Sequence, residues 1–323
     1  MGLLFVDGFD HYATVTQKWP NNVGGAIGAY GRFGTNGMRF VWIQNYVWRS
    51  IGSNYGTIYA GVAAKADTPW TLLKFVEGTS TQFCLYVDGA GHLCAYRGNL
   101  ANLLATSTLT VDASVYHYYE VKVVFSTTVG QVTAKVDGVE FLNTPANLNT
   151  CATGNAYING VGFAGTGNSG CTIDYDDFYV ADDAFQGDCR IISAMPSGAG
   201  NYAQWDPSAG ANYACVDETP PVTTDYVSTT VLNEIDTYAM ADISPTVGTV
   251  KAVVGNYYVQ KTDAGSRQIG MTTRLASTDL VSTGQAVPSS WGFLQFIQET
   301  KPGGGAWSVQ DTKDAEMGMK LTV

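Results

Sequence analysis

The feature that most constrains the fold is a strict alternation of apolar and polar side chains in residues 118–142, which read YYEVKVVFSTTVGQVTAKVDGVEFL. Apolar side chains occupy every second position in two runs, residues 119–125 and 132–136. A period of two places successive side chains on opposite faces of a β-sheet. The segment STTVG between the runs predicts a hairpin loop, and Asp137-Gly138 predicts a second, tight turn. The pattern is typical of a β-sandwich in which one face of each sheet is exposed to solvent.

The rest of the chain favours strands in the same way. Charged residues make up only 14% of the 323 residues, and there are 37 glycines, a composition that suits sheets joined by tight turns. Further strands are predicted at Leu3–Phe9, Met38–Trp48, Ile58–Ala64, Leu72–Val76, in a hairpin at Gln82–Tyr96, and at Tyr157–Phe163 and Thr172–Val180. We therefore predict an all-β protein that begins with a jelly-roll sandwich.

The character of the chain changes after about residue 184. Residues 197–224 are rich in Gly, Ser, Ala and Pro, which indicates either a linker or a long connection. Beyond them, strands are predicted at Val250–Gln260, Arg267–Leu275 and Trp291–Gln298. At 323 residues the chain exceeds the about 100–200 residues of an ordinary domain. We expect two domains, residues 1–184 and 185–323, of which the second is smaller and β-rich.

One short helix is expected in the second domain. Ser308 and Asp311 have the spacing of a capping box, which satisfies two backbone amides at a helix start. Gly318 is suited to end a helix. The sequence therefore predicts a helix over residues 309–317.

Charge and hydropathy exclude several classes of protein. The formal net charge is −11 and Lys and Arg form no cluster, so we expect no binding to nucleic acid. No stretch approaches the roughly 20 apolar residues of a membrane span, so we expect no membrane insertion. The first twelve residues lack the basic region and apolar run of a secretion signal, which favours synthesis and folding in a cytosol. In that compartment the six cysteines are expected to be reduced thiols rather than disulfides, although Cys84 and Cys94 would face each other if residues 88–90 form a hairpin loop.

Most residue patterns that indicate catalysis or cofactor binding are absent from the sequence. Sandwich enzymes that cleave glycans need two carboxylates beside the bond, and no alternating acid motif is present. Glu120 is expected to be a structural strand residue that points to solvent beside Lys122. The segment GVGFAG at residues 160–165 has the spacing of a dinucleotide fingerprint, but the following TGNSG cannot begin the helix that such a site requires. We expect no catalytic role and no organic cofactor.

Two groups of acidic residues allow a metal hypothesis. Asp7 and Asp10 follow the first strand, and Asp176 and Asp177 lie in the last strand of the first domain. If these strands pair, the four carboxylates approach one another, and calcium prefers several oxygen ligands. The alternative is that they are solvated acids at strand ends, since no EF-hand spacing is present.

One aromatic stripe allows a glycan-binding hypothesis. Trp42, Tyr46 and Trp48 share the same parity on a predicted strand. Exposed, they would form a platform for stacking on sugar rings. The same stripe equally describes a sandwich core, where large aromatics contribute most of the burial. We expect at least two of the three to be core residues.

The first domain resembles the laminin-G-like or concanavalin-A-like jelly roll in three pieces, LLFVDGFDHY, residues 117–142 and CTIDYDDFYVAD. Over nearly the whole chain the sequence also resembles virion proteins of tailed bacteriophages that carry such a domain. The C-terminal pieces that carry this resemblance are WDPSAGANYACVDE, VKAVVGNYYVQKTDAGSRQ and ETKPGGGAWSVQDTKDAEMGMK.

The resemblance implies a structural component of a virion, such as a tail or head appendage, fibre or decoration protein, assembled in the host cytoplasm. It implies homo-oligomers, contacts with other virion proteins, and a displayed surface that touches bacterial polysaccharide. Two alternatives remain open, a lectin-like carbohydrate-binding module outside any virion and a polysaccharide-cleaving enzyme.

Overall fold

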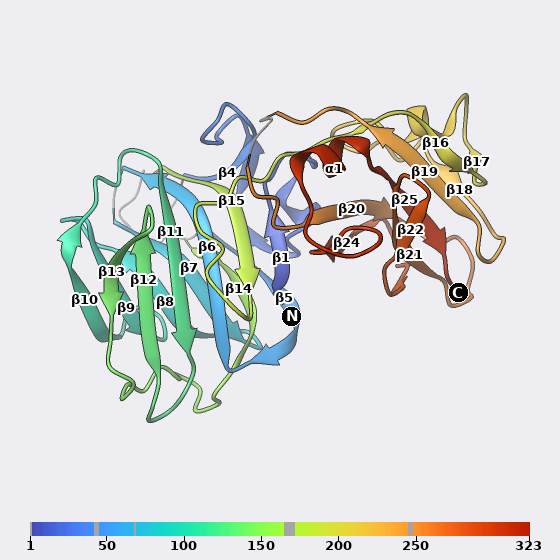
Figure 1. Ribbon diagram of the computed structural model, residues 1–323. Coiled ribbons are helices and arrows are strands. Elements are labelled where there is room, and N and C mark those ends of the chain that lie inside the picture. Colours follow the sequence, from blue (N-terminus) through green and yellow to red (C-terminus); the bar gives the residue numbers. More distant parts are fainter. Residues whose placement is uncertain (1, 42–44, 68, 165–171, 245–247) are drawn as a thin grey trace. The chain divides into compact units, whose positions relative to one another are not determined.

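The computed structural model describes residues 2–323 with the exception of 42–44, 68, 165–171 and 245–247. The chain forms two compact units, Met1–Ile191 and Ile192–Val323 (Figure 1). Both consist of β-strands, and the one short α-helix of the described residues lies in the second unit. The predicted all-β fold class is thus confirmed. No helix among the described residues has the length and apolar character to cross a membrane.

Two antiparallel sheets build the first unit. Sheet A has the order β13 (Val139–Asn143), β12 (Gln131–Val136), β11 (His117–Val124), β6 (Thr57–Ala66), β15 (Ile173–Ala181), β4 (Gly37–Phe40) and β3 (Ala26–Gly28), and β1 (Leu3–Asp7) also pairs with β15. Sheet B has the order β10 (Asn102–Thr110), β9 (His92–Arg97), β8 (Ser80–Val87), β7 (Trp70–Glu77), β14 (Ile158–Ala164), β5 (Tyr46–Tyr55) and β2 (Asn21–Val23). A single turn of 3₁₀ helix, Val15–Gln17, follows β1.

Aromatic side chains from the two sheets meet between them. Phe163 of sheet B stacks on Tyr175 of sheet A with ring centroids 4.4 Å apart. Trp70 of sheet B meets Tyr119 of sheet A edge to face at 6.2 Å. All four side chains are fully buried, and burying a large aromatic removes about 150–250 Å² from water. The first unit is therefore a β-sandwich whose core lies between the sheets.

The alternating segment folds as its pattern predicts. Strands β11 and β12 form a hairpin in which Val124 lies opposite Gln131. Val136 lies opposite Val139, so the intervening turn contains only Asp137 and Gly138. Both turn residues have positive φ, 49° and 79°, as a type I′ hairpin turn requires. The hairpin loop and the tight turn are confirmed.

The aromatic run Met38–Trp48 is not one strand. Its first part forms β4 in sheet A and its last part begins β5 in sheet B. The chain crosses from one sheet to the other in between, so parity counted through the run does not report a common face. The prediction of a single strand here was wrong for that reason.

The first unit ends after Ile191 rather than at residue 184. Three backbone groups of the added segment bond to buried side chains of the sandwich. The amide of Gly187 donates to Glu120 Oε1 (2.9 Å), that of Ile191 donates to Asp177 Oδ1 (2.6 Å), and the carbonyl of Cys189 accepts from Arg32 Nη2 (2.5 Å). These bonds hold residues 187–191 on the first unit, and the composition of the segment gives no sign of them.

The second unit has a six-stranded sheet and two separate pairs of strands. The sheet has the order β16 (Pro196–Ala203), β19 (Ile235–Met240), β25 (Glu316–Leu321), β21 (Gln268–Leu275) and β22 (Thr278–Val281), and β23 (Gln285–Ala286) also pairs with β21. The pairs are β17 (Asp206–Pro207) with β18 (Val227–Ser228), and β20 (Val253–Val259) with β24 (Gly292–Gln298). A 3₁₀ turn, Asn212–Cys215, follows β17. The Gly-rich stretch that sequence alone assigned to a linker or connection thus contributes an edge strand, β16.

The helix α1 spans Val309–Asp314 and is shorter than predicted. Its capping box is present, because Ser308 Oγ accepts from the amide of Asp311 and the Asp311 carboxylate accepts from the amide of Ser308. Gly318 is not its stop and lies inside β25. A Cβ atom at Gly318 would come within 1.8 Å of the carbonyl oxygen of Asp236 on β19. That glycine therefore serves close strand packing rather than helix termination.

Candidate functional site

The acidic residues predicted as calcium ligands lie near one another, but Asp7 is already saturated. Its Oδ2 accepts from Trp19 Nε1 (2.7 Å) and Tyr12 Oη (2.8 Å). Its Oδ1 accepts from the amide of Phe9 (3.0 Å) and from Lys18 Nζ (3.2 Å). Both side chains of the Asp7–Lys18 ion pair have no solvent exposure. An ionised carboxylate in a dry site needs such partners.

The pKa values of Asp7 and Lys18 are set by their burial and by the attraction between their charges. Burial alone would raise the pKa of Asp7, but the Lys18 ammonium and the hydrogen bonds that the Asp7 carboxylate accepts from Phe9 and Trp19 hold that pKa below its usual value. Burial lowers the pKa of Lys18 to about 8 although Asp7 opposes this. His11, which lies 3.1 Å from Lys18 Nζ, has its pKa lowered to about 3 by burial and by the lysine charge. Asp7 and Lys18 are thus charged at neutral pH and His11 is neutral.

Asp176 and Asp177 are also buried, and Arg32 connects them. The Arg32 amide donates to Asp176 Oδ2 (2.9 Å), and its Nε donates to Asp177 Oδ2 (2.7 Å). Its guanidinium further pairs with the exposed Asp188 (2.7 Å). Burial together with the neighbouring charge of Asp177 raises the pKa of Asp176 to about 7. Burial also raises the pKa of Asp177, although the guanidinium opposes this.

The four predicted calcium ligands thus accept hydrogen bonds from donors of the protein itself, and the calcium site stays a prediction. Burial raises the pKa of Asp10 to about 6, and one of its oxygens accepts from the amide of Asn36. Nowhere in the described part of the chain do three or more acidic, histidine or cysteine side chains group so as to hold a metal ion. The alternative of solvated acids is wrong for Asp7, Asp176 and Asp177, since their exposure is at most 2%. We call Asp7, Asp10, Lys18, Arg32, Asp176 and Asp177 the charged cluster.

Glu120 is a second buried acid that the sequence placed wrongly in solvent. It is 2% exposed and its Oε1 accepts from Tyr179 Oη (2.5 Å) as well as from the amide of Gly187. The register of β11 with β6 puts it opposite Gly61, where a Cβ would meet the Tyr179 ring at 2.2 Å. The missing side chain at Gly61 makes room for that ring. Glu120 is a structural residue, as predicted, but an internal one.

The aromatic stripe predicted for glycan binding is partly on the surface. Tyr46 is 38% exposed and Trp48 is half-buried on β5. Their intervening neighbour Val47 is fully buried, so the two rings point away from the sandwich core. Trp42 lies outside the described residues. The expectation that at least two of the three are core residues is wrong for Tyr46 and Trp48.

Strand register extends this stripe across the outer face of sheet B. Trp48 lies opposite Gly162 of β14, which in turn lies opposite Lys74 of β7. Lys74 lies opposite Cys84 of β8, and Cys84 lies opposite Tyr96 of β9. Residues directly opposite each other on paired strands share a face. Trp48, Lys74 and Tyr96 therefore occupy one row on the outer face.

A second row runs beside the first. Tyr46 pairs with Ala164, and Tyr86 pairs with Cys94. The rings of Tyr86 and Tyr96 meet edge to face at 6.0 Å. Both tyrosines are half-buried, whereas Leu85 and Val87 on either side of Tyr86 are fully buried in the core. We call Tyr46, Trp48, Lys74, Tyr86 and Tyr96 the tyrosine face (strands in Figure 1).

Two glycines of β14 allow the indole of Trp48 to lie low on this face. A Cβ at Gly162 would come within 2.7 Å of Trp48 Cβ, and one at Gly160 within 3.3 Å of Trp48 Cε3. Any larger residue would push the ring off the sheet. This is the structural role of Gly160 and Gly162, the first two glycines of GVGFAG, which lie in β14; the third lies outside the described residues.

Lys74 is the cation of the tyrosine face. Its Nζ lies 5.5 Å from the ring centroid of Tyr46, a cation–π distance. Among the described residues it has no acidic partner, in contrast to Lys18. Burial lowers its pKa, and burial raises the pKa of Tyr86 and Tyr96. The face thus combines aromatic rings with one positive charge that has no acidic partner among the residues described.

The cysteines beneath the face are thiols that do not face each other. Cys84 lies opposite Tyr96, and Cys94 lies opposite Tyr86, because Val87 pairs with Leu93 and the three-residue loop that would have aligned the two cysteines does not form. Burial raises the pKa of the Cys84 thiol to about 11. Cys84, Cys94, Cys151 and Cys215 are free and buried.

Sequence reasoning missed Lys74, Tyr86 and Tyr96. A signal was present at Lys74 and Tyr86, which each stand between two apolar residues that are buried, but not at Tyr96, which is followed by Arg97. Sequence periodicity identified the strands, but only the register of five strands places these side chains together with Tyr46 and Trp48.

Comparison with known proteins yields only distant likenesses. No protein-family model matches the sequence, and no curated protein matches it. Among solved structures, an endo-β-1,4-glucuronan lyase from the fungus Trichoderma reesei is 12% identical, with a TM-score of 0.43 over 55% of this chain and 94% of that chain. An alginate lyase is 12% identical, with a TM-score of 0.38 over 55% and 96%. A galectin from Caenorhabditis elegans is 9% identical, with a TM-score of 0.30 over 44% and 94%. Likenesses at this level assign no function to the chain.

Proposed function

We propose that the first unit binds a polysaccharide on its tyrosine face without cleaving it. The observation that carries the proposal is the open row of half-buried aromatic rings around the unpaired Lys74. Ligand sites are typically lined by aromatic side chains with a few polar groups that fix orientation. A single cation without an acidic partner in the part of the chain that the structure describes favours an acidic sugar chain over a neutral one.

We further propose that the protein is a structural component of a tailed-bacteriophage virion and is displayed there in many copies. The support is the sequence resemblance over nearly the whole chain. Contact with a bacterial surface polysaccharide then gains from multiplicity, because linked weak sites multiply their effective affinity. Other virion proteins and further copies of the chain are the expected partners.

The binding proposal is tested with the full-length protein on immobilised bacterial polysaccharides, acidic and neutral. We expect retention on acidic chains, and we expect Trp48→Ala to weaken it about tenfold, which corresponds to about 1.4 kcal/mol. Phe141→Ala is the matched control, since Phe141 is a half-buried aromatic of β13 in the other sheet. Equal losses in both variants, or no retention on any chain, would refute the proposal.

The virion proposal needs its own experiment. Antibody raised against the protein should label phage particles at a fixed position in electron micrographs. Its absence from purified particles of the phage that encodes it would leave a free carbohydrate-binding module as the better description.

A second function, cleavage of an acidic polysaccharide by elimination, is favoured by one observation. Lys74, with its lowered pKa, lies close to the Tyr46 ring. Neutral Lys74 would take the proton from the carbon beside the sugar carboxylate, and the Tyr46 hydroxyl would donate a proton to the leaving oxygen. The products are a shortened chain with a new hydroxyl and a sugar with a carbon–carbon double bond. Ultraviolet absorbance of that double bond, abolished by Lys74→Gln, would establish cleavage and overturn the non-catalytic proposal.

A further inference from the structure

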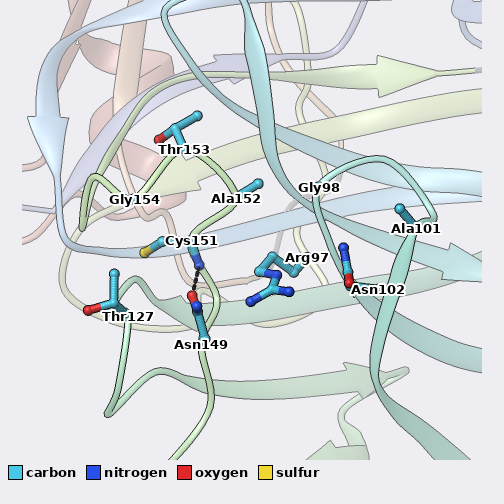
Figure 2. A pocket seen from close by; sticks show the side chains of 10 residues that line it. All are labelled: Arg97, Gly98, Ala101, Asn102, Thr127, Asn149, Cys151, Ala152, Thr153 and Gly154. Atoms are coloured by element: carbon cyan, nitrogen blue, oxygen red, sulfur yellow. Dashed lines mark hydrogen bonds between the residues drawn. The ribbon is translucent and has the colours of Figure 1, made fainter.

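A pocket of about 660 Å³ lies at the end of the first unit, apart from the tyrosine face. Its walls come from the β9–β10 turn, from Thr127 in the β11–β12 loop, and from residues 149–154 (Figure 2). Arg97 and Tyr96 are consecutive on β9, so their side chains leave opposite faces of the strand. Figure 2 shows the Arg97 side chain among the lining residues, between Asn149 and Asn102. The volume lies within the about 300–1,000 Å³ of small-molecule sites.

One wall of the pocket is held in place by a buried glutamine. Gln82 is fully buried, and its Oε1 accepts from the amide of Thr153 (2.8 Å). Its Nε2 donates to the carbonyls of Asn155 (2.6 Å) and Tyr157 (3.2 Å). Three bonds from one side chain fix this segment, so the wall is formed before any ligand arrives.

A buried threonine fixes the neighbouring wall. Thr150 Oγ1 donates to the carbonyl of Val124 (2.8 Å) and accepts from the amide of Ser126 (3.0 Å). The amide of Cys151 donates to Asn149 Oδ1 (3.0 Å), which leaves the amide nitrogen of Asn149 as its available donor (Figure 2). A preformed wall lowers the entropy cost of binding.

The polar side chains that line the pocket include one guanidinium, two amides and two hydroxyls. Within the described part of the chain the Arg97 guanidinium has no ion pair and no hydrogen bond, and none of the lining residues is acidic. The amides of Asn102 and Asn149 and the hydroxyl of Thr127 lie around it. A guanidinium presents two parallel N–H groups that match a carboxylate. An unpaired guanidinium in a concave, acid-free site is therefore complementary to a ligand that carries one carboxylate and several hydroxyls.

We propose that this pocket binds one carboxylate-bearing sugar residue, a uronic acid, through Arg97. The choice of a sugar as the carrier of the carboxylate rests on the proposed function. The pocket is a second glycan subsite, which binds the carboxylate of a single sugar residue, whereas the tyrosine face binds a stretch of chain through its aromatic rings and Lys74.

The test titrates the full-length protein with D-glucuronate and follows binding by calorimetry or by ligand-observed magnetic resonance. We expect glucuronate to bind and glucose to bind at least tenfold more weakly. Arg97→Gln should lose at least tenfold in affinity, and Arg97→Lys, which keeps the charge but not the paired donors, should lose less. Arg190→Gln is the control, because Arg190 is exposed elsewhere on the first unit and its loss changes the net charge equally.

Three results would overturn the assignment. Equal affinities for glucose and glucuronate would show that the site does not recognise the carboxylate. Equal glucuronate affinities of Arg97→Gln and wild type would show that this pocket is not the site. Acetate or sulfate binding as tightly as glucuronate would make it a general anion site. Failure here is distinguishable from failure of the proposed function, since Trp48→Ala should weaken polymer retention and leave glucuronate monomer binding unchanged.

Discussion

The first unit has two polar regions that are built in opposite ways. In the charged cluster, Lys18 is fully buried and bonds to Asp7, whose oxygens accept from four donors. On the tyrosine face, Lys74 is half-buried and has no acidic partner among the described residues. Both lysines belong to the same sandwich and both have lowered pKa values through burial.

The difference separates stability from binding. A buried charge must be paired, and removing its partner leaves it uncompensated in a low dielectric. A cation that keeps contact with water can remain unpaired, and its hydrogen-bonding capacity is then available to a ligand. Saturation of Asp7 therefore leaves that carboxylate no free acceptor for a ligand, and the unsaturated Lys74 argues for a ligand on the tyrosine face.

The largest expected effect comes from breaking the saturated region. Asp7→Ala removes the acceptor of four hydrogen bonds and leaves Lys18 buried without its counter-charge. We expect the free energy of unfolding to fall by about 3–5 kcal/mol, as measured by urea denaturation.

Asp188→Asn is the matched control for that change. Asp188 also pairs with a cation of the cluster, Arg32, but its side chain is 53% exposed. An exposed pair contributes at most about 1 kcal/mol. If Asp188→Asn destabilised the protein as much as Asp7→Ala, burial would not be what distinguishes the two regions.

A pH dependence follows from the raised pKa values in the charged cluster. Asp176 has its pKa raised from 3.8 to about 7, so between these pH values the native state binds more protons than the unfolded state. The free energy of unfolding must then fall as pH rises through this window. Asp10 and Asp177 act in the same direction, whereas the lowered pKa of His11 opposes them below 6.5.

Because His11 opposes Asp176 in this pH range, the test compares the stability of wild type and Asp176→Asn at each pH. Asp176→Asn cannot ionise, so its stability relative to wild type should rise steadily between pH 4 and about 7. Parallel stability curves for the two proteins would show that Asp176 does not titrate in this range.

Much of the fold could be predicted because β-structure has a local signature. Alternation in residues 118–142 fixed β11, β12 and both turns, and the capping-box spacing located α1. The predictions that failed concern residues whose positions depend on contacts between segments distant in the sequence. Gly318 reads as a helix stop until the carbonyl of Asp236 is placed against it, and Glu120 reads as a solvent residue until Tyr179 is placed beside it.

The candidate site was predictable only in part for the same reason. Tyr46 and Trp48 were found because they share one strand, whereas Lys74 and Tyr96 belong to other strands whose order no local pattern reveals. The acidic residues were correctly expected to be close, but their donors could not be foreseen. Lys18 and Trp19 lie eleven and twelve positions from Asp7, with a loop and a 3₁₀ turn between them.

Substitution of Lys74 on the tyrosine face should change polysaccharide binding. Lys74→Gln removes the one cation of the tyrosine face and is expected to weaken retention on an acidic polysaccharide about tenfold, which is about 1.4 kcal/mol. The loss should shrink as salt is added, because an exposed charge is screened. Neutral chains, if any bind, should be unaffected. A loss that is independent of both salt and ligand charge would mean that Lys74 contributes by packing alone.

The smallest expected effect is that of the same substitution on stability, and it gives the sharpest contrast with the charged cluster. Lys74→Gln breaks no ion pair and keeps a polar group of similar reach at a half-buried position, so the free energy of unfolding should change by no more than about 0.5 kcal/mol. The sign should be favourable if anything, since burial lowers the pKa of Lys74 and so disfavours its charged form. Urea denaturation of Lys74→Gln beside Lys18→Gln measures the contrast directly. A loss of several kcal/mol at Lys74 would show that this lysine is structural, and the tyrosine face would then have no spare cation to offer a ligand.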